Sequence, residues 1–193
     1  MPLFDFAAKY IVRELEDYWS EDPDDKGKLT IWGVASASFP THVKAMAKMT
    51  KEKAYEYALE NVYMPKWKQA QCDEWSPGVA VLVFDMAIQH GVKNNVKNIT
   101  RDKLFKVNRG ALDMLQQAAR AYPFDGIVGP ITRGTVKKWD QLQLIHELVA
   151  IRNAYYGNLE SFEDFDHGWM RRSALIHGLC QNIYWQSQFI DAR

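Results

Sequence analysis

The sequence lacks the features that mark several broad classes of protein. Lysine plus arginine and aspartate plus glutamate both number 24, so the formal net charge is zero. Proteins that bind nucleic acid usually carry a basic surplus for the phosphates, and none is present here. The longest uninterrupted apolar run is Val79–Phe84, which is far too short to cross a membrane. We therefore expect neither nucleic-acid binding nor membrane insertion.

Cysteine is scarce, since the chain holds only Cys72 and Cys180. Neither lies in a CxxC pair or near a histidine at ligand spacing, which argues against a zinc site. The main interpretation is two buried or idle thiols, and a long-range disulfide is the alternative. The five histidines show no zinc-binding spacing, and motifs for nucleotides, zinc proteases and nucleophile elbows are absent. The sequence therefore predicts no metal and no cofactor.

What the chain does have is ordinary globular composition with an excess of aromatic residues. It has 193 residues, of which 47% are hydrophobic and 25% charged, and this length predicts one domain with at most a small C-terminal appendage. Aromatic residues make up 13%. Flat rings with a polar tip suit carbohydrate faces and wet clefts, while filling the core of a helical protein is the alternative.

Apolar spacing predicts a mostly helical chain with one small β element. Leu29–Ala35 is rich in β-forming residues and is expected to form a short strand or hairpin arm. Pro77–His90 is apolar almost all round, which is typical of a central, buried helix. No alternation of strands and helices supports a Rossmann or barrel fold. The expected helices cover residues 3–19, 41–49, 51–63, 77–90, 110–120, 131–139, 139–156 and 169–189, with a loop at 158–168.

Local signals set the expected helix boundaries. Thr50 is predicted to cap the helix that follows it, and Pro65 is predicted to stop that helix. Ser76 followed by Pro77 is a helix start signal, and Gly91 is expected just past the end of the same helix.

The segment ELEDYWSEDPDDKGKLT contains the strongest candidate for chemistry. Glu16 falls near the C-terminal end of the first predicted helix, where the helix dipole and aromatic neighbours both raise the pKa of a carboxyl group, as a general acid requires. Asp25 and Thr30 follow on the next loop and strand, where a carboxylate and a hydroxyl can hold a water. Two carboxyl groups so arranged are typical of glycoside hydrolysis. A solvated acidic loop beside a helix end is the alternative.

The same segment resembles the N-terminal motif of glycoside hydrolase family 108, which reads Glu-Gly-Gly-aromatic, then Asp-Pro-x-Asp-x-Gly-Gly-x-Thr, an aromatic and Gly-Ile. Tyr63 and Trp67 resemble the aromatic pair after the second helix of that family. Further similar motifs follow in order: FDMAIQHG at 84–91 resembles the central helix, DGIVGPIT at 125–132 resembles a DGxxGPxT turn, and residues 152–156, Phe165 and 168–172 resemble the predicted peptidoglycan-binding segment. The resemblance spans roughly residues 4–175.

This resemblance implies a lysozyme-like α+β fold, predominantly helical, with seven to eight helices and one small β element. Residues 1–138 are expected to form the catalytic domain, and 139–193 a helical peptidoglycan-binding-like segment packed on it as one unit. The implied activity is that of a phage or prophage endolysin, a muramidase that cleaves the β-1,4 bond between N-acetylmuramic acid and N-acetylglucosamine in peptidoglycan strands. No secretory signal is recognisable at the N-terminus, so we expect synthesis in the cytoplasm and action at the cell wall or periplasm after release.

The resemblance also assigns roles to individual residues. Glu16 would protonate the glycosidic oxygen, Asp25 would stabilise the oxocarbenium-like transition state or orient water, and Thr30 would help to place that water. The family has two glycines where this chain has Asp17 and Tyr18, so the alternative is a lysozyme-fold wall-binding, virion or secretion-accessory protein that lacks turnover. Candidate substrate-binding residues are Tyr18, Trp32, Gln89 and His90, and candidate wall-binding residues, for which structural packing is the alternative, are Trp169 and Arg172.

Overall fold

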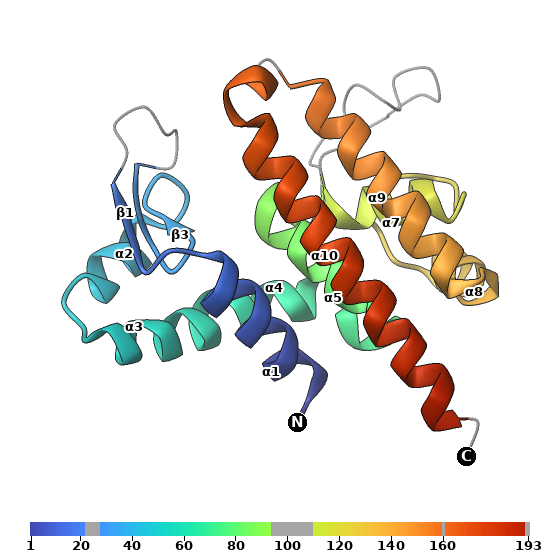
Figure 1. The fold of residues 1–193 in the computed structure, drawn as a ribbon, viewed down its shortest axis with the longest axis horizontal. Helices are drawn as coiled ribbons and strands as arrows, with labels where there is room; N and C mark the ends of the chain where they lie inside the picture. The colour runs from blue at the N-terminus through green and yellow to red at the C-terminus, as the bar shows by residue number, and fades with distance from the viewer. Residues whose placement is uncertain (22–27, 94–109, 160, 192–193) are drawn as a thin grey trace. The chain divides into compact units, whose positions relative to one another are not determined.

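The structure is a computed structural model that describes residues 1–21, 28–93, 110–159 and 161–191 (Figure 1). It divides into two compact units, Met1–Lys68 and Gln69–Arg193. Helices dominate the described residues, which also contain one small antiparallel sheet in the first unit. The predicted α+β, mainly helical, lysozyme-like fold is therefore confirmed. Within the same residues, every helix is too short or too polar to span a membrane.

The first unit begins with α1 (Leu3–Ala8), which continues into a π-helical turn, η1 (Lys9–Arg13). The chain then leaves the helix and forms strand β1 (Trp19–Glu21). The prediction of a helix over 3–19 is therefore wrong at its C-terminal end. Backbone pairing of β1 with a neighbouring strand replaces helical hydrogen bonds there, and Trp19 is 45% exposed.

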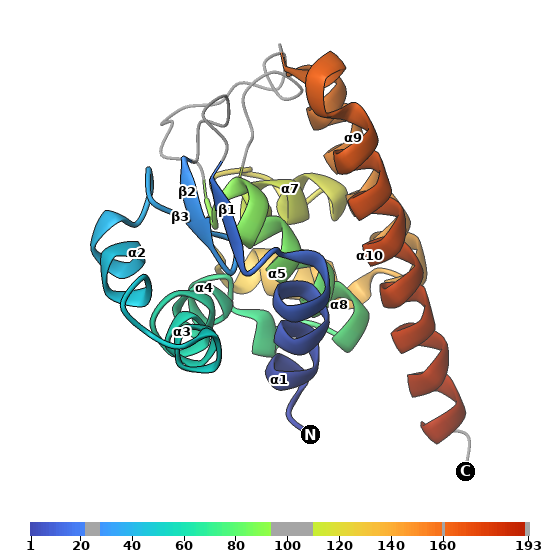
Figure 2. The same ribbon diagram turned by 60° about the vertical axis from the view of Figure 1, so that its left-hand side comes forward.

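The sheet has the order β1-β2-β3, with β2 at Leu29–Ile31 and β3 at Val34–Ala35, and all pairs are antiparallel. The β element predicted at Leu29–Ala35 is confirmed, and it is a complete hairpin rather than one arm. Helix α2 (Pro40–Met46) packs on β2 and β3 (Figure 2).

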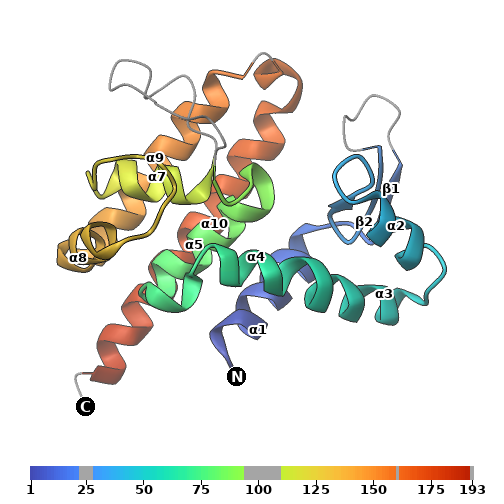
Figure 3. The same ribbon diagram turned by 180° about the vertical axis from the view of Figure 1, so that it is seen from behind.

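A long helical rod completes the first unit (Figure 3). It consists of α3 (Lys51–Ala58), the π-helical turn η2 (Leu59–Tyr63) and α4 (Met64–Gln69). The predicted cap is confirmed, because the Thr50 hydroxyl accepts a hydrogen bond from the Lys53 amide at 3.4 Å. The predicted stop at Pro65 is wrong. Proline lacks an amide hydrogen and crowds the preceding turn, and the wider π-helical turn directly before it lets the helix continue.

The second unit is built around α5 (Pro77–His90), whose residues Gly78–Ala87 are all buried. This confirms the prediction of a central buried helix, and Gly91 follows its end with a φ of 79° as expected. At Gly78 a Cβ would lie 2.8 Å from the Cys180 carbonyl oxygen, so only glycine allows this close backbone approach. The other helices of the unit are η3 (Cys72–Glu74), α7 (Ala111–Ala118), α8 (Pro130–Lys138), α9 (Gln141–Gly157) and α10 (Phe162–Asp191).

Helices α9 and α10 pack on each other and on α5 (Figure 1). The predicted loop at 158–168 is helical from Phe162 onward. Phe165 lies one turn before Trp169, and the two rings stack with centroids 5.6 Å apart, which extends the helix toward its N-terminus. The assignment of a catalytic role to residues 1–138 and a wall-binding role to 139–193 stays a prediction.

Both cysteines are buried and free. Burial raises the pKa of the Cys72 thiol and of the Cys180 thiol, so both stay protonated at neutral pH. The interpretation as idle thiols is therefore confirmed, and the disulfide alternative is wrong.

Candidate active site

Glu16 lies at the point where the N-terminal helical segment ends. The chain is helical through Leu15, and Glu16, which is half-buried, begins the connection to β1. Its carboxyl group therefore belongs to a residue just beyond the helix C-terminus, which carries a partial negative charge.

The turn between β2 and β3 consists of Trp32 and Gly33, whose φ values are 50° and 74°. Two-residue hairpin turns of this kind need positive φ at both positions, which glycine adopts freely and tryptophan does not. Three hydrogen bonds hold Trp32 in this conformation. Its backbone amide donates to the Tyr18 carbonyl at 3.0 Å, its carbonyl accepts from the Tyr63 hydroxyl at 2.5 Å, and its indole Nε1 donates to the Lys51 carbonyl at 3.1 Å.

The second turn residue, Gly33, forms the surface against which the Glu16 side chain packs. A Cβ at position 33 would lie 2.7 Å from the Glu16 Cδ and 2.8 Å from its Oε2, distances that real Cβ atoms essentially never show. The carboxyl group of Glu16 therefore occupies the space of a side chain at position 33, and a substitution there would make the Glu16 side chain shift. The hairpin turn fixes one side of the candidate general acid.

Aromatic rings surround the turn. The Trp32 ring lies 5.5 Å from Tyr18 and 5.2 Å from Tyr55, and it is only 6% exposed. The Lys51 ammonium lies 5.4 Å from the Tyr18 and Trp32 centroids, within cation–π range of both rings. Trp32 is therefore packed inside the unit, whereas Tyr18 is half-buried and keeps an accessible part, and the substrate-binding role of both stays a prediction.

Thr30 lies in β2, paired with Ser20 and Ala35. It is partly exposed, and its hydroxyl donates to the Lys28 carbonyl at a long 3.4 Å. Asp25, the second predicted carboxylate, lies outside the described residues. Glu16, Tyr18, Thr30 and Trp32 thus belong to one compact unit and to one sheet with its preceding connection.

The other two candidate substrate-binding residues, Gln89 and His90, lie in the second unit at the end of α5. Gln89 is exposed. The His90 ring packs edge-on against Tyr155 and Tyr156, with centroids 5.0 and 5.1 Å away. Burial and the nearby Arg152 charge lower the pKa of His90 to about 3, so it is neutral at physiological pH.

The predicted wall-binding residues take part in internal packing. Trp169 stacks on Tyr156 with centroids 5.1 Å apart and an interplanar angle of 18°. Arg172 bonds the Asp85 carboxylate through Nε at 3.0 Å and Nη2 at 2.7 Å. Arg152, fully buried, reaches the other Asp85 oxygen at 2.6 Å. Burial pushes the pKa of Asp85 up, but the two arginines outweigh it and hold that pKa below its usual range. These contacts favour the packing interpretation of Trp169 and Arg172.

The turn at 125–132 is organised by the buried side chain of Gln116. Its amide nitrogen donates to Asp125 Oδ1 at 3.0 Å, to the Ile127 carbonyl at 3.1 Å and to Thr132 Oγ1 at 3.2 Å, while its Oε1 accepts from the Gly126 amide at 2.7 Å. One amide group therefore fixes the whole turn.

Comparison with known proteins agrees with this geometry. The model of the family described as glycosyl hydrolase 108 matches residues 9–91, which include Glu16 and the entire sheet. Residues 9–91, less than half of the chain, are therefore similar to glycosyl hydrolase 108. Among solved structures, that of Brucella abortus SagA is similar with a TM-score of 0.72 and 25% sequence identity, covering 93% of this chain and 94% of that one. No curated protein matches the chain significantly.

The match to glycosyl hydrolase 108 supports glycoside hydrolase activity in general and a glycan as the corresponding substrate. Among the described residues, no group of three or more histidine, cysteine, aspartate or glutamate side chains is placed to hold a metal ion. Within the described part of residues 9–91, the Glu16 carboxyl group packs against the turn between β2 and β3.

Sequence reasoning missed two features of the molecule. The role of Gly33 against Glu16 was not recognised, although the Trp-Gly pair between two β-forming runs is a turn signal. The buried group formed by Asp85, Arg152 and Arg172 was also missed. Its signal was a charged residue at Asp85 inside an otherwise apolar helix, because a buried carboxylate demands cationic partners.

We expect Gly33→Ala to lower glycan-hydrolysing activity by about 100-fold, because a displacement of a catalytic group by roughly 1 Å has effects of that size. The added methyl group needs the space that the Glu16 carboxyl group holds. Positive φ also makes alanine less stable there by about 1–2 kcal/mol. Turbidity loss of purified sacculi and thermal unfolding measure the two effects.

Gly91→Ala is the matched control, because Gly91 also has positive φ, at 79°, but nothing lies within 4 Å of its Cβ position. It should show the loss of stability without a comparable loss of activity. Equal activity losses in the two variants would mean that contact with Glu16 is not the cause.

We expect the free energy of unfolding to fall by about 2 kcal/mol between pH 6.5 and pH 5 through His90. Its pKa in the folded protein is about 3, whereas in the unfolded chain it is near 6.5. The unfolded state therefore binds a proton first as the pH falls, so the stabilisation is complete above pH 6.5 and is lost toward pH 3. Urea unfolding at stepped pH should show this slope disappearing in His90→Phe. It should persist in His167→Phe, which changes an exposed histidine.

Proposed function

We propose that the protein is a peptidoglycan muramidase of the endolysin type, which hydrolyses the β-1,4 bond between N-acetylmuramic acid and N-acetylglucosamine. The observation that supports this most is the packing of the Glu16 carboxyl group on Gly33, inside the segment that is similar to glycosyl hydrolase 108. A half-buried carboxyl group at a helix end, held beside a small antiparallel sheet, has the environment that a general acid needs.

In the proposed reaction, Glu16 gives its proton to the glycosidic oxygen as the bond from that oxygen to the anomeric carbon breaks. The positive charge that develops on the sugar ring is stabilised by the Asp25 carboxylate. A water molecule, oriented by Asp25 or by the Thr30 hydroxyl, supplies the oxygen that bonds to the anomeric carbon. The proton that this water loses is taken up by the carboxylate of Glu16 or of Asp25. Exchange of protons with solvent then returns Glu16 to its acid form.

The same unit offers one ring for contact with sugar. Tyr18 follows Glu16 by two positions in the sequence, and its side chain is partly accessible. Flat aromatic faces pack against the apolar face of a sugar ring. Trp32 contributes indirectly, because it holds the hairpin turn that positions Glu16. We further propose that the chain acts at the cell wall or periplasm after release from the cytoplasm.

Mass analysis of the soluble products from purified sacculi tests this proposal. Fragments ending in reducing N-acetylmuramic acid would support the muramidase reaction. Anhydro-muramic ends would mean that no water is added and that the protein is a lytic transglycosylase. Binding to sacculi without released fragments would favour the alternative of a wall-binding protein without turnover, in which Asp17 and Tyr18 replace the family's two glycines.

A further inference from the structure

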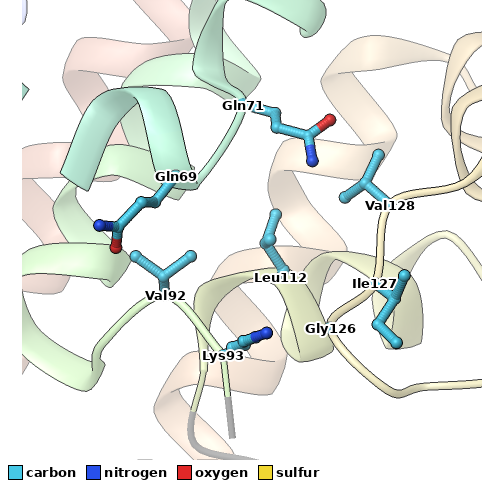
Figure 4. A pocket seen from close by; sticks show the side chains of 8 residues that line it. All are labelled: Gln69, Gln71, Val92, Lys93, Leu112, Gly126, Ile127 and Val128. Atoms are coloured by element: carbon cyan, nitrogen blue, oxygen red, sulfur yellow. The ribbon is translucent and has the colours of Figure 1, made fainter. Parts of the chain in front are cut away.

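A cavity of about 400 Å³ lies within the second unit, in a different compact unit from Glu16 (Figure 4). Its walls include four aliphatic side chains, those of Val92, Leu112, Ile127 and Val128. A cavity of this size holds a small molecule of about two amino-acid residues. Its largely aliphatic lining favours a ligand with small apolar groups.

Gln71 turns a hydrogen-bond donor toward this cavity. Its backbone lies in the left-handed region, with a φ of 51°. Its Oε1 accepts a hydrogen bond from Arg133 Nη2 at 2.7 Å, and because arginine can only donate, this contact fixes which end of the amide is oxygen. The Nε2 amide group is left as the end that faces the cavity, as Figure 4 shows.

Lys93 is held at the opposite side of the cavity by its backbone. The Ala111 and Leu112 amides at the start of α7 donate to the carbonyls of Gly91 and Val92 at 3.0 and 2.9 Å. These two bonds hold the peptide groups before and after Val92, the residue that precedes Lys93. They tie the lysine to α7 independently of its own side chain.

Two glycines leave the space that Lys93 occupies. A Cβ at Gly110 would lie 2.3 Å from the Lys93 Cα, and a Cβ at Gly126 would lie 2.7 Å from the Lys93 Cβ. Within the described ranges Lys93 forms no ion pair, and it carries the one formal charge among the side chains that line the cavity. The buried carboxylate of Asp113 lies within 3.4 Å of the Cβ positions of both glycines but does not line the cavity.

We infer that this cavity binds the carboxyl end of a short peptide with small aliphatic side chains. The Lys93 ammonium is the donor for the carboxylate, the Gln71 amide at the opposite side is a donor for a backbone carbonyl of the same peptide, and the aliphatic wall receives the methyl groups. A free phosphate would be poorly matched, because most of the wall offers it no donor. We identify this peptide as the stem peptide that peptidoglycan carries on its muramic acid. This identification rests on the proposed function.

Binding of N-acetyl-D-alanyl-D-alanine to the unmodified chain, followed by NMR titration, tests the inference. This probe has no glycosidic bond, so its binding does not depend on hydrolysis by the protein. For a ligand of this size we expect a Kd on the order of 1 mM. The carboxamide form of the probe should bind about tenfold more weakly, because it has lost the charge that Lys93 recognises.

Variants locate the site. Lys93→Met keeps the length of the side chain and should weaken binding by about tenfold, and Gln71→Leu by about fivefold, in line with the loss of one charged and one neutral hydrogen bond. Lys137→Met, which removes an exposed lysine of α8 outside the cavity, should leave binding unchanged. If Lys93→Met fails to fold by circular dichroism, Gln71→Leu and the carboxamide decide the question.

Three results would overturn the inference: no saturation at about thirty times the expected Kd, equal binding of the acid and the carboxamide, or displacement of the peptide by inorganic phosphate at lower concentration. The muramidase proposal fails separately. Loss of sacculus digestion with retained peptide binding would reject the enzyme and keep the site, whereas digestion without peptide binding would reject the site alone.

Discussion

Glu16→Gln is expected to remove sacculus digestion while the protein stays folded. The substitution keeps the shape of the side chain, and therefore its packing on Gly33, but deletes the proton that the glycosidic oxygen must receive. General acid catalysis contributes about 10²–10⁴-fold to the rate, so the loss should be of that order. Dye release from labelled sacculi measures the activity, and circular dichroism with thermal unfolding measures the fold.

Glu14→Gln is the matched control, since Glu14 is an exposed glutamate two positions earlier. It should retain activity close to that of the unmodified protein. If Glu16→Gln kept more than about a tenth of the activity, the assignment would be contradicted. Loss of a general acid should lower the rate by at least about 100-fold. Loss of the folded spectrum would instead assign Glu16 a structural role.

Asp85→Ala is expected to lower the free energy of unfolding by about 3–5 kcal/mol, which is much of the stability of a typical domain. Asp85 and Arg152 are both fully buried, and Arg172 is 12% exposed. Removing the carboxylate leaves Arg152 as a buried charge without its anion, which is the most destabilising way to break a buried ion pair. Urea unfolding at neutral pH measures the change.

A double variant that replaces both Asp85 and Arg152 distinguishes the effect of an unpaired buried charge from that of a packing defect. Asp85→Leu combined with Arg152→Met fills the space with apolar groups and leaves Arg172, the more accessible arginine, to reach solvent. The double variant should be more stable than Asp85→Ala. Asp164→Ala, at an exposed aspartate of α10, should change stability by less than about 0.5 kcal/mol. A double variant no more stable than Asp85→Ala would show that the unpaired charge is not what destabilises the single variant.

Local signals predicted the elements whose stability is itself local. Thr50 as a cap, Pro77 as the first residue of α5 and Gly91 just past its end could be predicted because each acts through hydrogen bonds or dihedral preferences within one turn. The buried character of α5 could also be predicted, since a helix that is apolar on every face needs neighbours on every face.

Two of the errors arose where partners distant in sequence override local preference, and a third arose from an unrecognised local turn. Trp19 completes a helical apolar stripe in the sequence, yet strand pairing with Ile31 holds it in β1. Pro65 is a strong helix breaker in isolation, but the π-helical turn before it accommodates the ring. The position of α10 likewise depends on stacking of Trp169 on Tyr156 of α9. A local window of sequence contains neither the strand pairing of Trp19 nor the ring stacking of Trp169, whereas the turn before Pro65 is local but has no sequence signal that we recognised.

The candidate site was predictable to a similar degree. The spacing of Glu16 and Thr30 placed both residues around one sheet, because only a short connection and one hairpin separate them. What could not be derived is that Gly33 shapes the place of the carboxyl group, since that contact depends on how the hairpin folds back. The grouping of Gln89 and His90 with Glu16 stays a prediction.

The close approach of α10 to α5 has a consequence for biosynthesis. Gly78 meets the backbone at Cys180, so the apolar surface of α5 is covered by a helix that ends about 100 residues later in the chain. At translation rates of about 5–20 residues per second, α5 leaves the ribosome roughly 5–20 seconds before its cover exists. During that interval its valine, leucine and phenylalanine side chains are available to chaperones and to neighbouring nascent chains. A ribosome that stalls after α9 would therefore release a polypeptide whose most apolar helix lacks its C-terminal partner.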